Sequence, residues 1–470
     1  MTIKKAIIGV PGAGKTTLIA ELIKSNKIDL NNIVFTSLTN ATIRALLTKT
    51  ELSKKILSIR TIYGLAYIEL DRNLLLTEEN KKSLKNPDKI KKTILRKHGI
   101  LATDNILKDT DSVFVSIVLN SLEKNKDLRE SIADHELLVN FMFGKKRYYR
   151  ILDYLSELVF LYEMGKFYDY IFLLYDSIRN NLDFFNVYKS LDIINPNPTI
   201  VFDEFQDVPK VIIDYVKSLG KNMIILGDPA QSIFSWLRTQ PNIYTEAKKV
   251  FYLNKTKRFG DSISKLANDI LRRAGYHYKI LSDAEGDQVY IIDSRGALSD
   301  LLSYVYKVYR GEEGSIIVLT RTRYQAKLIE KNLERLGYDV VNLEYIEYDR
   351  LLRVAMKYIK SLKEKKGILF YLNKNKQDTT KTIKNKHIEK YINAILDRRR
   401  VVFVSTVHNV KGLEFDNVIY YNSLPRKVVS AVDLGISNKK EEYKVLYVGV
   451  TRAKKNLYII NDINRYYLYI

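Results

Sequence analysis

The stretch Ala6–Thr16, which reads AIIGVPGAGKT, decides the fold of this 470-residue chain. An apolar run typical of a buried strand leads into the pattern G-x-x-x-x-G-K-T, and the helix-like segment Thr17–Ile23 follows directly. Glycines in such a loop let backbone N–H groups converge on an anionic phosphate at a helix N-terminus. The stretch therefore predicts an α/β fold with a phosphate-binding loop made of Gly9, Gly12, Ala13, Gly14, Lys15, Thr16 and Thr17.

A second stretch, Val201–Asp207 with the sequence VFDEFQD, ends an apolar run in two adjacent carboxylates. Burying Asp203 and Glu204 together is costly unless a cation lies nearby, although a purely structural pair is the alternative. With the phosphate loop, the pair predicts metal-assisted hydrolysis of a nucleotide, with ATP and Mg²⁺ as cofactors. Thr16 and Asp203 would hold Mg²⁺, Lys15 would lie against the β- and γ-phosphates, and Glu204 would deprotonate the attacking water.

The composition indicates a polyanionic partner. The net charge is +23 and the pI about 9.5, and basic surfaces bind phosphate backbones through counterion release. The alternative is a bias towards Lys, Ile, Asn and Tyr of the kind that an A/T-rich genome produces. The chain has no cysteine, which excludes disulfides, thiol catalysis and cysteine-ligated zinc, and its five histidines are too scattered to indicate a metal site.

Membrane insertion is not expected from the sequence. No segment reaches the roughly 18 apolar residues of a membrane span, and Pro11 and Lys15 interrupt the apolar run near the N-terminus. We therefore expect a soluble protein of the cytoplasm, or of the host cytoplasm if the gene is viral.

Strand-like apolar runs alternate with helical patterns in two blocks, which predicts two parallel sheets. The runs are Ala6–Ile8, Asn32–Thr36, Thr199–Asp203 and Met223–Gly227 in the first block, and Ser315–Leu319, Val401–Ser405, Asn417–Tyr420 and Asn456–Ile460 in the second. We expect a first α/β core in residues 1–66 and 196–250, and a second in residues 251–338 and 401–470.

Two helical stretches interrupt these cores. Residues 67–195 form a predicted helical insertion, in which apolar residues from Ile151 to Tyr162 recur with helical spacing. Its many tyrosines suit either base stacking or an aromatic core. Residues 339–400 form a predicted basic helical accessory insertion ending in DRRR at Asp397–Arg400, which suits either a solvated charged face or contact with a DNA backbone.

Further short motifs stand in a fixed order along the chain. Besides the phosphate loop and DEFQD they read GDPAQSIFSW at Gly227–Trp236, TVHNVKGLEF at Thr406–Phe415 and YVGVTRA at Tyr447–Ala453. This ordered set resembles the UvrD/Rep-type superfamily 1A DNA helicases, over roughly half of the chain. The resemblance implies two RecA-like P-loop NTPase domains with parallel sheets, plus helical insertions.

The resemblance also implies roles for residues outside the two opening stretches. Gln231 would hydrogen-bond the γ-phosphate or the attacking water. Arg258 and Arg452 would be arginine fingers from the second block, and Glu414 would approach the ribose. Without the motif match, isolated arginines in a chain this basic are more often surface residues.

Single-stranded DNA is the substrate that the resemblance implies. Phe234 and Trp236 suit base stacking, although an aromatic pair at this spacing also suits a core. Ser37–Ala41 is similar to a T-x-T-N-x-A element, and Arg60–Gly64 to a T-x-H element with tyrosine in place of histidine. The candidate strand contacts are therefore Thr39, Asn40, Thr61, Tyr63, Phe234, Trp236 and His408.

Several positions depart from the family pattern. We expect no upstream glutamine element of the kind that reads adenine, because the phosphate loop starts within ten residues of Met1. Lys257, Thr17 and Leu237 stand where the family carries a tyrosine and two arginines. Adenine selectivity is therefore open, with GTP or relaxed use as the alternative to ATP. The accessory insertion is short for the family, and we expect no appended nuclease after Arg452.

The expected function is an ATP-driven translocase and helicase acting on single-stranded and tailed duplex DNA, with 3′-to-5′ polarity inferred from the resemblance alone. We expect a monomer that works with other replication or repair proteins. One alternative is a DNA-stimulated ATPase that translocates without unwinding. Another is a DNA-binding module that has lost hydrolysis, against which the intact Lys15, Asp203 and Glu204 argue.

Overall fold

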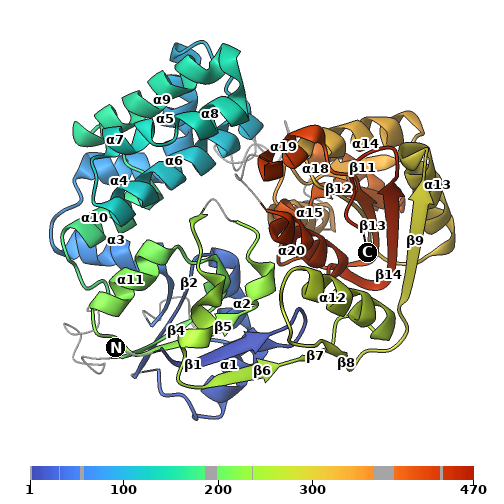
Figure 1. Cartoon of the computed structure of the whole chain (residues 1–470), viewed down its shortest axis with the longest axis horizontal. Coiled ribbons are helices and arrows are strands. Elements are labelled where there is room, and N and C mark those ends of the chain that lie inside the picture. The colour runs from blue at the N-terminus through green and yellow to red at the C-terminus, as the bar shows by residue number, and fades with distance from the viewer. Residues whose placement is uncertain are drawn as a thin grey trace. The chain divides into compact units, whose positions relative to one another are not determined.

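The computed structural model describes residues 3–30, 32–52, 58–185, 198–234, 237–363, 386–433 and 438–469. The chain divides into two compact units. The first comprises Met1–Val10 and Gly14–Leu253, and the second comprises Pro11–Ala13 and Asn254–Ile470. Each unit contains one six-stranded sheet, so the predicted α/β class with two sheet-bearing cores is confirmed (Figure 1).

The first unit is built on a parallel sheet with the order β3-β2-β4-β5-β1-β6. Its strands are β1 (Ile3–Gly9), β2 (Ile33–Ser37), β3 (Ile59–Thr61), β4 (Thr199–Phe202), β5 (Met223–Gly227) and β6 (Val250–Leu253). Helices α1 (Lys15–Lys24), α2 (Asn40–Thr50) and α11 (Lys210–Ser218) belong to the same core. Because parallel strands end at one edge, the segments after β1, β2 and β4 lie together there.

Burial explains why these segments form strands. β2 is buried at every position, and Phe35 and Val201 pack with Ile19 and Leu46 of α1 and α2 in one apolar cluster. The four predicted strand runs of this block coincide with β1, β2, β4 and β5. β6 extends the sheet to Leu253, which moves the predicted boundary at residues 250/251 three residues towards the C-terminus.

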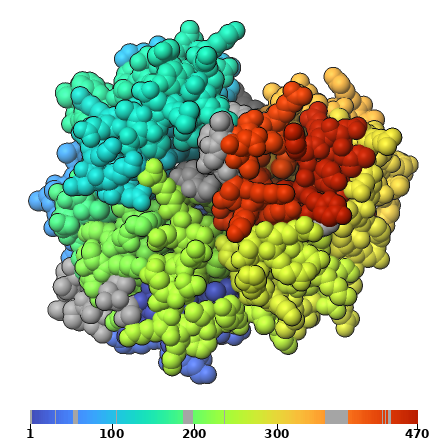
Figure 2. Space-filling view, in the orientation of Figure 1, coloured from blue at the N-terminus to red at the C-terminus, as the bar shows by residue number. Residues whose placement is uncertain are grey.

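The predicted helical insertion contains eight helices in its described part, shown in light blue to teal in Figures 1 and 2. They are α3 (Ile62–Arg72), α4 (Glu78–Lys85), α5 (Pro87–Lys97), α6 (Asp104–Lys124), α7 (Leu128–Ala133), α8 (Glu136–Phe143), α9 (Lys145–Glu163) and α10 (Tyr170–Arg179). On α9 the predicted stripe is buried, including Tyr154, and Tyr162 stacks on Phe172 with ring centroids 3.7 Å apart. These tyrosines therefore form an aromatic core, the alternative to base stacking.

The second unit has a parallel sheet with the order β11-β12-β10-β13-β14-β9. Its strands are β9 (Gln288–Ser294), β10 (Ile316–Thr320), β11 (Asp339–Asn342), β12 (Val401–Thr406), β13 (Phe415–Asn422) and β14 (Ala453–Asp462); β7 (Lys255–Thr256) pairs separately with β8 (Leu281–Ser282). Its helices are α12 (Asp261–Arg273), α13 (Ala297–Gly311), α14 (Arg323–Arg335), α15 (Tyr348–Lys363), α18 (Lys386–Leu396), α19 (Arg426–Asp433) and α20 (Lys439–Val450). The four predicted runs of this block coincide with β10, β12, β13 and β14.

The accessory insertion needs a correction at its first end. Residues 339–342, predicted to open it, instead form β11 at the edge of the second sheet, with Val340 and Val341 fully buried. At the other end, Arg399 pairs with Asp339, and Arg400 donates to the carbonyls of Tyr309 (2.5 Å) and Gly314 (2.8 Å). These two arginines therefore fasten the sheet edge, and residues 364–385 of the insertion lie outside the described part.

Among the described residues, no helix combines the length and apolarity needed to cross a bilayer.

Candidate functional site

The phosphate loop joins β1 to α1 and is shaped by its glycines. Gly14 caps α1 with φ 79°, and the first turn of α1 carries no acidic residue that would compete with an anion for its N–H groups. Lys15 Nζ donates to the carbonyl of Gly9 at 2.8 Å, and a Cβ on Gly9 would lie 2.5 Å from Lys15 Cγ. The Thr17 hydroxyl accepts a hydrogen bond from Lys49 Nζ at 2.5 Å. The Lys15 side chain thus folds back over the loop, and it can approach the backbone this closely only because residue 9 is glycine.

Asp203 lies directly after β4, and its side chain is fully buried. Its Oδ2 accepts from the Thr16 hydroxyl at 3.2 Å, and its Oδ1 accepts from the Glu204 N–H at 2.9 Å. Burial, and then the neighbouring Glu204 charge, raise the pKa of Asp203 to about 6, while Lys15 acts in the opposite direction. This carboxyl group is therefore ready to be stabilised by a cation.

The pair of Thr16 and Asp203 fits a magnesium ion. A hydroxyl and a carboxylate are hard oxygen donors, and Mg²⁺ commonly takes only one or two protein ligands beside phosphate and water. No group of three or more His, Asp or Glu side chains that could together hold a metal ion occurs in the part of the chain that the structure describes. A cation here would therefore take its other ligands from the nucleotide and solvent.

Glu204 has an unusual backbone conformation for a non-glycine residue, with φ 55°. Its carboxylate accepts a hydrogen bond from Gln206 Nε2 at 2.6 Å, and Gln206 Oε1 accepts from the Asp228 N–H at 3.1 Å. Asp228 in turn accepts from Gln231 Nε2 at 2.9 Å. The predicted base and the predicted phosphate sensor therefore belong to one polar network.

The centre of this network is tightly packed. A Cβ on Gly227 would lie 2.0 Å from Gln206 Oε1 and 2.3 Å from the Tyr244 hydroxyl, which donates to Gln206 Oε1 at 3.4 Å. Sequence analysis assigned no role to Gln206, Asp228 or Tyr244. Gln206 and Asp228 belong to the DEFQD and GDPAQSIFSW motifs, so their position in these motifs could have indicated a role. Tyr244 belongs to no quoted motif.

Arg258, Glu414 and Arg452 gather in the second unit near the start of β13 and β14. Arg258 donates from Nε to Glu414 Oε2 at 2.8 Å and from Nη1 to the carbonyl of Thr451 at 3.1 Å. Arg452 is buried, and it donates from Nε to the Val448 carbonyl at 2.9 Å and from Nη1 to the Leu413 carbonyl at 3.1 Å. The three residues predicted to act on the nucleotide from this block are thus brought together.

The segment Pro11–Ala13 of the phosphate loop belongs to the second unit, because residues that follow β6 form hydrogen bonds with it. The buried Thr256 hydroxyl donates to the Pro11 carbonyl at 2.7 Å and accepts from the Arg258 N–H at 3.1 Å. Lys257 N–H donates to the Gly12 carbonyl at 3.2 Å. A Cβ on Gly12, where φ is 76°, would lie 2.6 Å from Arg258 Cβ. Sequence analysis missed this anchoring role of Thr256.

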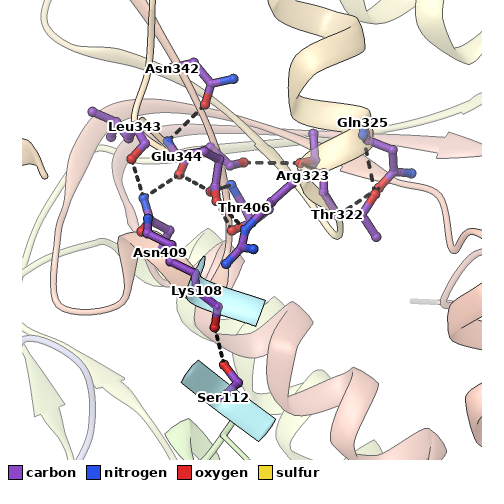
Figure 3. A network of polar contacts seen from close by, with 12 residues as sticks. Lys108, Ser112, Thr322, Arg323, Gln325, Asn342, Leu343, Glu344, Thr406 and Asn409 are labelled. Carbon is purple, nitrogen blue, oxygen red and sulfur yellow. Dashed lines mark hydrogen bonds and ion pairs between the residues drawn. The ribbon is translucent and has the colours of Figure 1, made fainter. Parts of the chain in front are cut away.

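The loop after β12 is fixed by a buried carboxylate, as Figure 3 shows. Glu344 Oε1 accepts from the Thr406 N–H at 2.9 Å and from the Thr406 hydroxyl at 2.7 Å, while Oε2 accepts from Arg323 Nε at 3.1 Å. Asn409 Nδ2 donates to the Leu343 carbonyl at 2.7 Å. The half-exposed His408 stands between Thr406 and Asn409 in this fixed loop.

The predicted DNA contacts of the first unit lie at the same sheet edge as the phosphate loop. Thr39 caps α2 through the Thr42 N–H (3.3 Å), and Thr61 caps α3 through the Gly64 N–H (3.2 Å). Asn40 is exposed, and burial raises the pKa of the half-buried Tyr63 to about 12. Phe234 is half-buried, and Trp236 lies outside the described residues.

Comparison with known proteins relates the chain to one family. The UvrD/REP helicase N-terminal domain matches residues 2–252, and the UvrD-like helicase C-terminal domain matches residues 350–463. A probable DNA helicase of Mycoplasma pneumoniae is 23% identical, over 75% of this chain and 61% of its own length. Gabija protein GajB of Bacillus cereus is 25% identical over 58% and 65%, and ATP-dependent DNA helicase Rep of Buchnera aphidicola is 24% identical over 71% and 54%.

The chain spans less than two thirds of the length of each of these three relatives. A solved structure of the PRRSV helicase superposes with a TM-score of 0.38 at 10% sequence identity, covering 98% of this chain and 52% of that one.

Proposed function

The chain belongs to the UvrD/Rep-type helicase family, and on this premise we propose that it is an ATP-driven translocase and helicase acting on single-stranded DNA. The observation that carries the proposal is the hydrogen bond from Thr16 to Asp203, 3.2 Å long, which joins the phosphate loop to the acidic motif. Glu204 stands beside it with its carboxylate held by Gln206. This arrangement supports hydrolysis of a nucleoside triphosphate bound at the end of α1.

In the proposed reaction, the loop amides and Lys15 bind the β- and γ-phosphates. This requires Lys15 Nζ to leave the Gly9 carbonyl. Thr16 and Asp203 would hold Mg²⁺, which would supply positive charge to the phosphate oxygens. Glu204 takes a proton from the attacking water, and Gln206 keeps the Glu204 carboxylate in one orientation. Gln231, linked through Asp228, senses the γ-phosphate or the water.

Phosphoryl transfer also needs positively charged groups beside the negatively charged phosphoryl oxygens, in addition to those that the loop supplies. Arg258 and Arg452 are the proposed sources, and Glu414 is proposed to approach the ribose. The hydrogen bonds of Arg258 use Nε and Nη1, so the remaining guanidinium nitrogen, Nη2, can donate to a phosphate while the pair with Glu414 stays formed.

Single-stranded DNA is proposed as the track, with 3′-to-5′ polarity taken from the family. The net charge of +23 supports a polyanionic ligand. Thr39, Asn40, Thr61 and Tyr63 at the edge of the first sheet support it as well, and Phe234, Trp236 and His408 complete the proposed contacts. ATP is the proposed nucleotide, and GTP is the competitor to test.

A translocase that does not separate strands is the second candidate. The stretch between β11 and β12 is short, and its described part contains only helices α15 and α18. A module without hydrolysis is disfavoured by the contact between Thr16 and Asp203.

The test measures ATPase rates with and without single-stranded DNA, and then unwinding of duplexes tailed at the 3′ or the 5′ end. Glu204→Gln should lower DNA-stimulated turnover by about 10²- to 10⁴-fold, the range typical of a lost general base, and should keep DNA binding. Glu79→Gln, an exposed residue of α4, is the matched control and should behave as wild type. Turnover unaffected by DNA would remove the motor proposal, equal stimulation by RNA would remove the DNA assignment, and stimulation without unwinding would select the translocase.

A further inference from the structure

A pocket of about 560 Å³ opens in the second unit between α13 and the turn that joins α14 to β11. Its wall is formed by three tyrosines, Tyr306, Tyr309 and Tyr338, together with Arg310 and Leu336. The eight lining residues include no acidic side chain. The pocket is therefore aromatic and positively charged.

The inner part of the pocket is rigid. The rings of Tyr309 and Tyr338 meet edge to face, with centroids 5.1 Å apart and an interplanar angle of 78°. The Arg400 guanidinium lies over the Tyr309 ring at 5.4 Å, and the Tyr309 hydroxyl donates to the Arg400 carbonyl at 3.3 Å. A ligand would therefore meet a preformed aromatic floor and would not have to order it.

The rim of the pocket offers an aromatic ring and positive charge to solvent. Tyr306 is 54% exposed, and the Arg310 guanidinium lies over its ring at 5.7 Å. In the described part of the chain, Arg310 forms no ion pair, and the only acidic residue of α13 is Asp300, near its other end. The Arg310 cation is available to an anionic ligand.

Flat rings beside an uncompensated cation suit a ligand that carries both aromatic groups and negative charge. Nucleotides of a single strand have this chemistry, because bases stack on aromatic side chains while phosphates pair with Arg and Lys. A proline-rich peptide also suits aromatic grooves, but it gains nothing from the unpaired Arg310. We propose that this pocket is a second binding site for single-stranded nucleic acid, with a base stacked on tyrosine and a phosphate at Arg310.

The site is distinct from the contacts proposed above. Tyr338 precedes the amino end of β11, whereas His408 follows the carboxyl end of its parallel neighbour β12. The two places lie at opposite ends of the strands, and the five steps from Val401 to Thr406, at roughly 3.3 Å each, separate them by about 17 Å along the strand. The pocket therefore adds a contact that the helicase motifs do not contain.

The test uses the full chain and measures binding of fluorescent oligothymidylates by anisotropy, without nucleotide. The variant Tyr306→Ala/Arg310→Glu is compared with Tyr466→Ala/Lys439→Glu, a matched pair of exposed residues of the same unit with the same change of charge. The pocket variant should bind at least about fivefold more weakly, as expected for one lost stacked base, and its log–log salt slope should fall by about one. The matched pair should leave both quantities unchanged, with circular dichroism melting as the control for folding.

Photocrosslinking with 4-thiothymidine oligonucleotides locates the contact, and the expected crosslinked peptides contain Tyr306 or Tyr338. Absence of these crosslinks, or equal affinity of the two double variants, would overturn the proposal. So would a proline-rich peptide that binds the wild type and is lost with the pocket variant while oligonucleotide affinity is retained. Failure of DNA to stimulate the ATPase would instead reject the proposed motor function, because the anisotropy experiment involves no turnover.

Discussion

Thr256 is a small buried residue with two backbone partners, and it ties the phosphate loop to Arg258. Its hydroxyl donates to the Pro11 carbonyl and accepts from the Arg258 N–H. Removing the hydroxyl leaves a buried acceptor and a buried donor unpaired, and such groups cost about 1–3 kcal/mol each when they lose their partner.

We therefore expect Thr256→Val, which keeps the shape of the side chain, to lower the free energy of unfolding by about 2–6 kcal/mol for the two groups together and to raise the KM for ATP. Thr256→Ser keeps the hydroxyl and should stay near wild type in both quantities. Urea unfolding and steady-state ATPase assays measure the two effects. If the Val and Ser variants were alike, the hydroxyl would have no part in holding the loop.

At Gly227 the packing depends on the absence of a Cβ atom. A methyl group there would meet Gln206 Oε1 and the Tyr244 hydroxyl at distances below van der Waals contact. Gly227→Ala should therefore destabilise the protein by about 1–3 kcal/mol, the range for overpacking, and should lower kcat because Gln206 holds Glu204.

The control for this variant is Gly311→Ala, at the end of α13, where a Cβ meets no atom within 4 Å. It should leave unfolding and turnover unchanged. A Gly227→Ala protein with normal stability and normal kcat would show that the Gln206 network adjusts freely, contrary to our expectation.

At the scale of elements, β11, α14 and α18 are joined by a buried polar cluster. The Asn342 N–H donates to His387 Nδ1 at 3.2 Å, so this nitrogen is unprotonated, and the His387 ring stacks on Tyr345 at 5.1 Å. Glu330 faces His387 Nε2 at 3.7 Å and accepts from Asn342 Nδ2 at 2.8 Å. The charged groups around the ring are Glu330, Glu334, Lys386 and Lys390. The cluster connects the end of the accessory stretch to the sheet.

Burial, opposed in part by Glu330, lowers the pKa of His387 to about 4. The unfolded chain, in which histidine has a pKa of about 6.5, therefore binds more protons than the folded chain between these values. Stability should fall as the pH drops from 6.5 towards 4. Urea titration across this range measures the unfolding free energy of wild type and of His387→Gln. As the pH drops, the unfolding free energy of wild type should decrease relative to that of His387→Gln. The exposed His277→Gln variant should show no such change.

At the scale of the whole molecule, the sequence sufficed for both sheets but not for all their strands. Runs such as Ile316–Thr320 are buried at every position and are therefore recognisable as continuous apolar stretches in the sequence. β3 has only three residues, β11 has only three buried residues within a charged stretch, and the edge strand β9 keeps Tyr290 and Ile291 exposed, so none presents a long run of buried apolar residues. Length and exposure explain why these strands were missed.

The candidate site divides in a similar way. Lys15, Thr16, Asp203 and Glu204 act through local motifs, and these can be read along the chain. Tyr244, Thr256 and Glu344 act through partners distant in sequence, such as Pro11 for Thr256 and Thr406 for Glu344. Only the folded chain brings these partners together, because no spacing rule connects them.

The last prediction concerns the two units, since each has its own sheet and apolar core. The only tryptophan, Trp236, belongs by sequence to the first unit, so its fluorescence follows that unit while circular dichroism follows both. A non-hydrolysable ATP analogue with Mg²⁺ at about 100 times its Kd should stabilise what it binds by about 2.7 kcal/mol. If Arg258 and Arg452 contact the nucleotide, the analogue should raise the midpoint of thermal unfolding followed by fluorescence and also the midpoint followed by circular dichroism. In Arg258→Ala, only the midpoint followed by fluorescence should keep most of this rise. Lys15→Ala should abolish both shifts, and an Arg258→Ala protein whose two transitions still rise as in wild type would contradict the proposed role of that arginine.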